Sequence, residues 1–126
     1  IMILGIGSDI IHIPRVAHAI ANERSLERVY TARERAYAES RGKTMTASLA
    51  ARFAGKEAVL KAFGTGLRCG KMTDIEILPD DLGAPIVHLD GYFAAHAQEM
   101  GVERVWITLS HERDYATAYC VLEGQR

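Results

Sequence analysis

Thr46–Gly66, with the sequence TASLAARFAGKEAVLKAFGTG, is the stretch that decides the fold. It predicts one long helix, because Thr46 can cap its start, helix formers fill its interior and Gly64 readily adopts the left-handed conformation that ends helices. At about 100° per residue, one face carries bulky apolar side chains: Leu49, Phe53, Leu60 and Phe63. Alanines form a second, smooth face suited to close packing. A helix that is apolar on nearly all sides belongs in the interior of a domain.

Charged side chains interrupt this apolar helix at four positions, Arg52, Lys56, Glu57 and Lys61. Lys56 projects into the bulky stripe, where an unpaired charge would be strongly destabilising. In one interpretation, Glu57 and Lys61 form an ordinary pair four residues apart, while Lys56 and Arg52 extend to solvent. In the other, an acid and several bases beside a core helix bind an anionic ligand or a metal ion.

Length and composition indicate a single globular domain spanning residues 1–126. Hydrophobic residues make up 48% of the chain and charged residues 25%, and no apolar run is long enough to span a bilayer. The first residues lack the features of a signal peptide, which predicts a cytoplasmic protein that has no membrane partner. Cys69 and Cys120 have neither metal-binding nor disulfide-framework spacing, so we expect reduced, structural thiols.

Charge is distributed unevenly along the chain. Residues 1–71 carry twelve Lys or Arg and six Asp or Glu, whereas residues 72–126 carry three and ten, so the two parts have net charges of +6 and −7. The basic part favours an anionic ligand or an acidic partner protein. Nucleic acid is not expected as a partner, because no dense basic stripe with interleaved aromatic residues is present.

An acid lies inside an apolar strand near the start of the chain. Residues 2–13, MILGIGSDIIHI, predict a strand that is apolar on both faces but contains Asp9. Such an aspartate is either a turn or edge residue, or a metal ligand or catalytic group. Gly5 and Gly7 strengthen the second interpretation, since glycine in a strand often marks where a ligand or another backbone comes close.

The remaining elements mix without a regular alternation of strand and helix. Thr31 and Glu34 form a capping box that opens a charged surface helix ending near Gly42. Helices are also expected from Pro14 to about Ala21, as a short turn around Arg24 and Arg28, and at 91–100. Strands are expected at 73–78, 86–89, 103–110 and 115–123, the last two forming an antiparallel pair joined through 111–114. This predicts an α+β fold: a single small domain with a mainly antiparallel sheet packed on a long central helix.

Four short motifs occur in a specific order: Gly7-Ser8-Asp9-Ile10-Ile11-His12-Ile13-Pro14-Arg15, Arg52-Phe53-Ala54-Gly55-Lys56-Glu57-Ala58, Lys61-Ala62 and Gly64-Thr65-Gly66. With them the chain resembles the bacterial holo-acyl carrier protein synthases, which are small 4′-phosphopantetheinyl transferases. The resemblance covers essentially the full length, including the terminal strand pair with Ser110-His111 between its members. His12 is a departure, because many members carry an acid there, but the Asp9 and Glu57 positions are unaffected.

The resemblance implies an activity. Enzymes of this family transfer 4′-phosphopantetheine from coenzyme A to a serine hydroxyl of an apo-acyl carrier protein, with Mg²⁺ as cofactor, and release adenosine 3′,5′-bisphosphate. In-line attack on a pyrophosphate requires mainly the positioning of two partners and the neutralisation of charge. Mg²⁺ prefers hard oxygen ligands and keeps several waters, which agrees with a site of only one or two carboxylates.

The resemblance also implies residue roles. Asp9 and Glu57 match the metal-binding positions, and Glu57 and Lys61 match the catalytic ones. The acceptor of the serine proton is left open between Glu57, a metal-bound water and a route assisted by Lys61. The residues expected to contact the coenzyme are Arg52, Lys56, Gly64, Thr65 and His111, with Arg52 and His111 near its 3′-phosphate. Their alternatives are an ordinary surface arginine and a loop histidine.

Partners follow from the same resemblance. Acyl carrier proteins are acidic, so Arg15, Arg24 and Arg28 are expected to dock the carrier, with a solvated basic face as the alternative. Members of this length assemble as homotrimers with sites between subunits. Two other classes remain possible on the residues alone: a non-catalytic α+β module that binds a nucleotide, and a structural subunit with paired charges. Neither gives a reason for two separated carboxylates.

Overall fold

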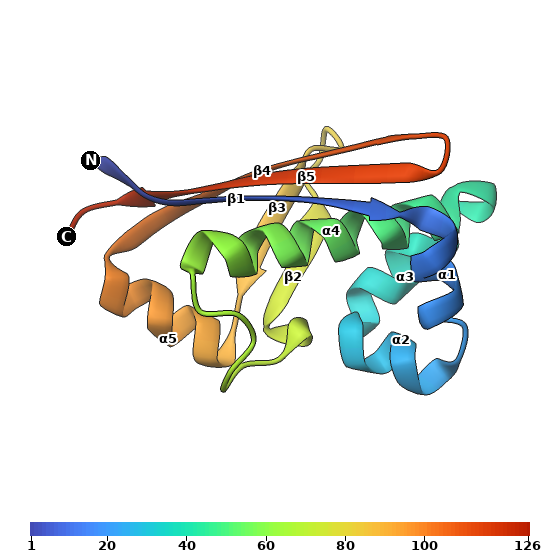
Figure 1. The fold of residues 1–126 in the computed structure, drawn as a ribbon, viewed down its shortest axis with the longest axis horizontal. Helices are drawn as coiled ribbons and strands as arrows, with labels where there is room; N and C mark the ends of the chain where they lie inside the picture. The colour runs from blue at the N-terminus through green and yellow to red at the C-terminus, as the bar shows by residue number, and fades with distance from the viewer.

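A long helix, α4 (Met45–Phe63), lies beneath a three-stranded sheet and forms the centre of the protein (Figure 1). A computed structural model describes all residues, 1–126. In chain order the elements are β1 (Met2–His12), α1 (Ile13–Ala19), α2 (Glu23–Val29), α3 (Ala32–Ser40), the 3₁₀ helix η1 (Gly42–Thr44), α4, the 3₁₀ helix η2 (Met72–Asp74), β2 (Ile75–Pro79), β3 (Pro85–Leu89), α5 (Gly91–Met100), β4 (Val102–Glu112) and β5 (Tyr115–Gly124). None of the helices combines the length and apolarity needed to span a membrane.

Helix α4 confirms the central prediction and differs from it at one end. Gly64 ends the helix with a φ of +76°, and its N–H donates to the carbonyl oxygens of Leu60 and Lys61. The start was predicted wrongly, because Thr46 lies inside the helix rather than at its cap. The turn of η1 leads directly into α4, so the helix begins at Met45 without a side-chain cap.

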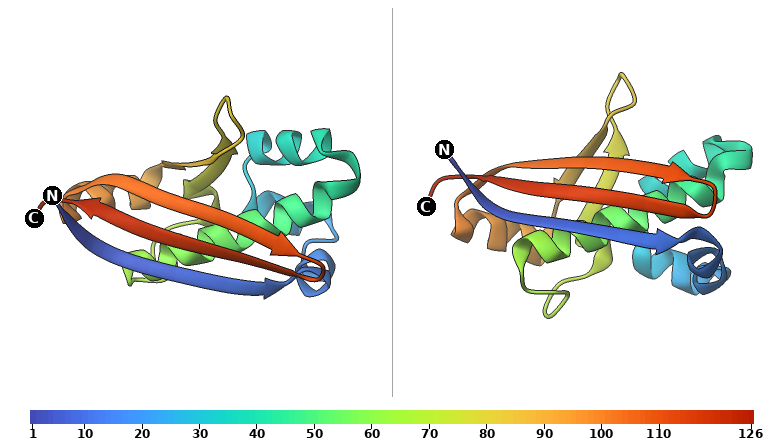
Figure 2. Two further views of the ribbon diagram at one scale, coloured as in Figure 1. Left: turned by 90° about the horizontal axis from the view of Figure 1, so that it is seen from above. Right: turned by 45° about the horizontal axis from the view of Figure 1, so that its top comes forward.

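All strand pairs are antiparallel, as predicted. The larger sheet has the order β1-β5-β4, and β2 and β3 form a separate hairpin. Figure 2 shows the three long strands side by side, with both termini at the same end and the β2–β3 hairpin projecting away from them. One face of the larger sheet covers α4, and the α+β prediction is confirmed.

Gly5 and Gly7 allow β1 to lie directly against α4. A Cβ at Gly7 would come within 2.0 Å of the carbonyl oxygen of Ala58, and one at Gly5 within 2.1 Å of that of Ala62. The smooth alanine face of the helix is therefore the surface on which the strand packs. Glycine in a strand was expected to mark the close approach of either a ligand or another backbone. Here the close neighbour is the backbone of α4.

The outer face of the larger sheet carries large apolar side chains in contact with solvent. They are Ile3, Ile6, Ile10, Trp106, Tyr115 and Tyr119, each at least half exposed. Alternation along the strands puts small and aliphatic residues of β5, such as Ala118 and Leu122, on the inner face against α4. Several large apolar side chains exposed on one face of a sheet indicate an interaction surface.

Candidate active site

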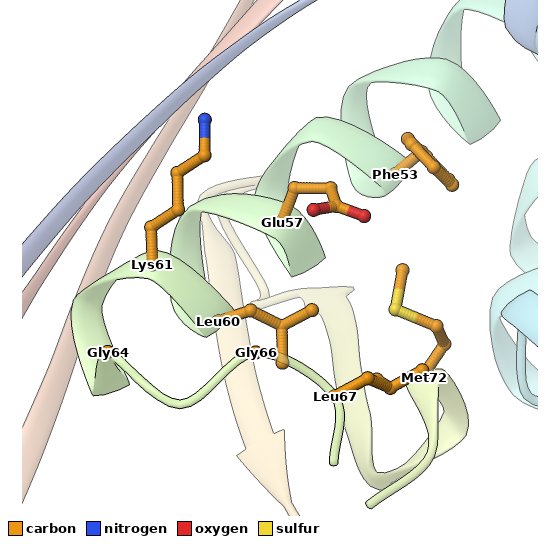
Figure 3. A pocket seen from close by; sticks show the side chains of 8 residues that line it. All are labelled: Phe53, Glu57, Leu60, Lys61, Gly64, Gly66, Leu67 and Met72. Carbon is orange, nitrogen blue, oxygen red and sulfur yellow. The ribbon is translucent and has the colours of Figure 1, made fainter.

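Asp9, Glu57 and Lys61 meet at the junction of β1 and α4. Asp9 lies on the inner side of β1, and Glu57 and Lys61 lie one turn apart on α4. The ammonium of Lys61 is 3.1 Å from Oδ1 of Asp9. Figure 3 shows Lys61 extending from α4 toward β1, while the carboxylate of Glu57 points along the neighbouring hollow. The structure thus brings together the two predicted metal ligands and the predicted lysine.

The surroundings of Glu57 raise its pKa. Burial raises the pKa of Glu57 above its ordinary value, and the nearby negative charge of Asp9 raises it further, while Lys61 acts in the opposite direction. A half-buried carboxylate beside a second negative charge forms a site where a cation or a proton is favoured. A raised pKa also brings the basicity of a carboxylate closer to that of an effective general base.

A cleft of about 590 Å³ opens beside these residues. On one side of the cleft lies α4, which contributes Phe53, Glu57, Leu60 and Lys61 and ends at Gly64 (Figure 3). On the other side lies the chain that follows α4, which contributes Gly66, Leu67 and Met72 (Figure 3). Thr65 lies between the two glycines but does not line the cleft. Phe53 and Leu60 were predicted only as core residues, and the hydrophobic pattern cannot distinguish a core side chain from one on an apolar cleft wall.

The donor set fits a hard divalent cation that takes few ligands from the protein. No three His, Cys, Asp or Glu side chains come together to enclose a metal. Asp9 and Glu57 supply two carboxylates, and their mutual repulsion, seen in the raised pKa of Glu57, would be relieved by a cation. Mg²⁺ suits such a site, since it is commonly held by one or two carboxylates together with substrate phosphates and water.

Arg52 and His111 line a second hollow, of about 200 Å³, that shares no lining residue with the first. Nε of Arg52 donates to the carbonyl oxygen of Ile77, and its guanidinium lies 4.7 Å from the ring centre of Tyr37. His111 was expected in a loop but lies in β4, paired with Ala116. Within one chain, these two residues are therefore on another side of α4 from Glu57 and Lys61.

Lys56 does not contact either hollow. Its side chain is fully buried, and Nζ donates to Glu34 Oε1 at 2.8 Å and to the carbonyl oxygens of Met72 and Ile75. Burial lowers the pKa of Lys56, and the carboxylate of Glu34 opposes this shift. With three partners for three N–H donors, Lys56 has none left for a coenzyme. The predicted contact of Lys56 with the coenzyme is therefore wrong, and so are both interpretations given for its charge, because Glu34 satisfies it rather than solvent or a bound ligand.

Glu34, the partner of Lys56, was missed as a buried residue. The predicted capping box is present, because Thr31 Oγ1 accepts from the Glu34 N–H and Glu34 Oε1 accepts from the Thr31 N–H. However, Glu34 has no exposed surface, so the helix that it opens is not purely a surface helix. The sequence did contain a signal for this pair. Lys56 lies in an apolar stripe and so needs an acidic partner, and Glu34 is an acid whose side chain is held in place by the cap of its own helix.

Arg15, Arg24 and Arg28 lie at the end of the molecule formed by α1 and α2. All three are exposed, and none of them forms an ion pair within the protein. Arg24 and Arg28 lie one turn apart on α2, and Arg15 lies on α1. Their guanidinium groups are thus available to an external acidic partner.

Residues 5–120 match the 4′-phosphopantetheinyl transferase superfamily. The chain belongs to this superfamily. Among its transferases, a holo-[acyl-carrier-protein] synthase of Clostridium acetobutylicum is 47% identical over 123 residues, which cover 97% of this chain and 98% of that relative. The family resemblance predicted from the four motifs is confirmed.

Solved structures of phosphopantetheinyl transferases have the same fold. The holo-[acyl-carrier-protein] synthase of Neisseria meningitidis superimposes with a TM-score of 0.88 at 34% identity, covering 97% of this chain and 99% of that one. An ACPS–CoA complex from Chronobacterium ammoniagenes superimposes with a TM-score of 0.85 at 35% identity, covering 97% and 98%. This transferase therefore shares its full architecture with solved holo-[acyl-carrier-protein] synthases.

Proposed function

We propose that this protein is a holo-acyl-carrier-protein synthase, which transfers 4′-phosphopantetheine from coenzyme A to a serine of an apo-acyl carrier protein. The names of its relatives and the coenzyme A bound to one of them support this function. The observation that carries it is the meeting of Asp9, Glu57 and Lys61 at the edge of an open cleft.

The reaction joins a serine oxygen to phosphorus and releases a nucleotide. The serine hydroxyl attacks the pyrophosphate phosphorus that carries the pantetheine arm, and the bond from this phosphorus to the bridging oxygen breaks. Adenosine 3′,5′-bisphosphate leaves with the electron pair of that bond, and the serine proton passes to a base. Little covalent chemistry is required of the protein, so positioning and charge neutralisation dominate the rate.

Glu57 and Lys61 have complementary roles in this proposal. The carboxylate of Glu57, which lines the cleft, accepts the serine proton. The ammonium of Lys61 stabilises negative charge on the pyrophosphate oxygens, and its contact with Asp9 holds it at the edge of the cleft. The backbone of Gly64 and Gly66 lets the nucleotide portion approach closely, with Thr65 between them.

Asp9 and Glu57 would hold Mg²⁺ at this site. The cation supplies neutralisation of charge on the phosphate oxygens when it is bound. The two carboxylates are contributed by different elements, so the packing of β1 on α4 sets their separation.

A homotrimer explains why the predicted coenzyme residues occupy two hollows. Arg52 and His111 would receive the 3′-phosphate of a coenzyme whose pyrophosphate lies against Glu57 and Lys61 of a neighbouring subunit. The exposed apolar face of β1, β5 and β4 offers a surface for such assembly. Carrier docking is assigned to Arg15, Arg24 and Arg28, which complement an acidic protein.

Mass spectrometry tests the function directly. The protein is mixed with coenzyme A, Mg²⁺ and an apo-acyl carrier protein, and the mass of the carrier is measured before and after the incubation. A gain of one phosphopantetheine group is expected, and none should occur in the presence of EDTA. A complex with coenzyme A and no change in the carrier would overturn the proposal in favour of a nucleotide-binding module.

A further inference from the structure

The buried pair of Lys56 and Glu34 has an unusual set of hydrogen-bond partners. Lys56 donates to the backbone carbonyls of Met72 and Ile75, and Glu34 Oε2 accepts from the N–H of Ile77 at 2.9 Å. Beyond the Glu34 capping box, every polar contact of the pair therefore falls within 72–77, the segment containing η2 and β2.

This segment forms part of the cleft wall. The side chain of Met72 lines the cleft opposite Glu57, and the loop that contains Gly66 and Leu67 leads into it. Lys56 is the residue directly before Glu57 on α4, so the same helical turn carries one side chain that lines the cleft and another that holds its far wall. Met72, where η2 begins, and Ile75, where β2 begins, are thereby both tied to α4 through one ammonium group.

A purely stabilising role does not explain why an ion pair is used here. Replacing a buried ion pair with apolar residues of similar volume is often neutral or stabilising, because two charges must be desolvated. What apolar residues cannot reproduce is a fixed hydrogen-bonded distance between α4 and the backbone of 72–77. We infer that Lys56 and Glu34 are positioning residues that hold the Met72 wall of the cleft against the Glu57 and Lys61 face, where coenzyme A binds.

This inference rests on the proposed function for the identity of the ligand, but not for the mechanical role of the pair. The variant Glu34→Gln/Lys56→Met removes both charges together and so leaves no unpaired buried ion. Tyr30→Phe is the matched control, because it removes a buried hydrogen bond of 2.6 Å to the Leu49 carbonyl and has no partner in the cleft wall.

Four measurements are compared, the first three of them at a temperature where all proteins are folded. Amide hydrogen exchange should become faster at 64–77 in the double variant and remain at the wild-type rate there in Tyr30→Phe. The Kd for coenzyme A by calorimetry should rise roughly 10- to 100-fold in the double variant only, and kcat/KM for coenzyme A should fall by a similar factor. Tyr30→Phe should have a lower melting temperature although its exchange at 64–77 and its affinity stay at the wild-type values, which separates stability from positioning.

Wild-type exchange at 64–77 together with wild-type affinity in the double variant would overturn the inference. If the double variant has no cooperative unfolding transition, Glu34→Gln/Lys56→Gln provides the same comparison with smaller expected changes, since it also removes both charges but keeps side-chain donors and acceptors for the backbone of 72–77. Failure of the wild-type protein to modify a carrier would instead refute the proposed function, and the exchange measurement would still decide the role of the pair.

Discussion

Nζ of Lys61 lies 3.1 Å from Oδ1 of Asp9, although the two residues are 52 positions apart in the chain. The contact exists because β1 packs on the alanine face of α4 with no side chain at Gly7 between them. The geometry of the candidate site is therefore set by the distance between one strand and one helix. Changes in that packing should alter activity without altering any reactive group.

Gly7→Ala should impair both stability and transfer. The new methyl group would meet the backbone of Ala58 at 2.0 Å, and neither backbone can easily move away. We expect a loss of about 1–3 kcal/mol in the free energy of unfolding and a fall of roughly 100-fold in kcat/KM, measured by chemical denaturation and by carrier modification. Ser8→Ala, on the exposed side of the same strand, should resemble wild type; equal effects of the two would contradict this account.

Asp9→Asn and Glu57→Gln should abolish most of the transfer activity while the fold remains. Each variant keeps the shape of the side chain and removes one carboxylate, and we expect a loss of roughly 100- to 1,000-fold in kcat/KM. Calorimetry with Mg²⁺ and coenzyme A should show weakened metal binding. Glu103→Gln, an exposed acid at the start of β4, is the control. Wild-type turnover by either variant at the same Mg²⁺ concentration would remove that residue from the site.

Reversal of charge at Arg15, Arg24 and Arg28 should weaken carrier recognition selectively. These exposed groups have no internal ion-pair partners, so their loss leaves the fold unchanged and removes attraction for an acidic protein. KM for the carrier should rise by roughly tenfold or more while KM for coenzyme A stays constant. The wild-type affinity for the carrier should also fall with added salt. Arg126→Glu, near the opposite end of the molecule, is the matched reversal; an equal rise in both KM values would exclude docking.

Mixed oligomers should recover activity if sites lie between subunits. His111→Ala is preferable to Arg52→Ala as the partner of Glu57→Ala, since His111 is exposed whereas Arg52 is buried and bonded to Ile77. Each variant alone should be nearly inactive. Refolded together in equal amounts, they should regain up to about a quarter of wild-type activity, because a site needs one subunit of each kind in the correct order. If light scattering shows that the protein is a monomer at the concentration at which it is fully active, the shared site is refuted.

Cys120 should make the protein sensitive to alkali. Burial raises the pKa of this thiol from 9.0 to about 12, so above pH 9 the unfolded chain loses a proton that the folded chain keeps. Its contribution to stability is fully present below pH 9 and is lost as the pH rises toward 12, by about 1.4 kcal/mol per pH unit. In Cys120→Ala the free energy of unfolding should fall less steeply over this range. Parallel curves for the two proteins in denaturation experiments would contradict the assignment.

The elements that follow local rules could be predicted from sequence. Gly64 at the end of α4 and the Thr31–Glu34 capping box each depend on a few neighbouring residues, and both are confirmed. The start of α4 could not be predicted in the same way. Thr44 and Thr46 are both plausible caps, and the choice depends on the preceding 3₁₀ turn, which leads into the helix with no cap bond at all.

The site was predictable where sequence spacing determines geometry. Glu57 and Lys61 share a face because they are four residues apart, and an acid in an apolar strand pointed to Asp9. The separation of Arg52 from Glu57 also follows from spacing, since five residues on a helix amount to about 140° of rotation. The Lys56–Glu34 pair did not follow, because it joins two helices whose relative placement is a tertiary property.

The pairing of β1 with β5 determines when the site can form during synthesis. Strand β1 has no other neighbour in its sheet, and the residue opposite Asp9 is Ala118. A chain emerging from a ribosome thus carries Asp9 long before β5, the strand that pairs with β1, has been translated. Helices α1 to α4 can form earlier from local contacts. The carboxylate pair is completed only by this long-range pairing of β1 with β5, so chains that have not yet been synthesised as far as β5 should not react with coenzyme A.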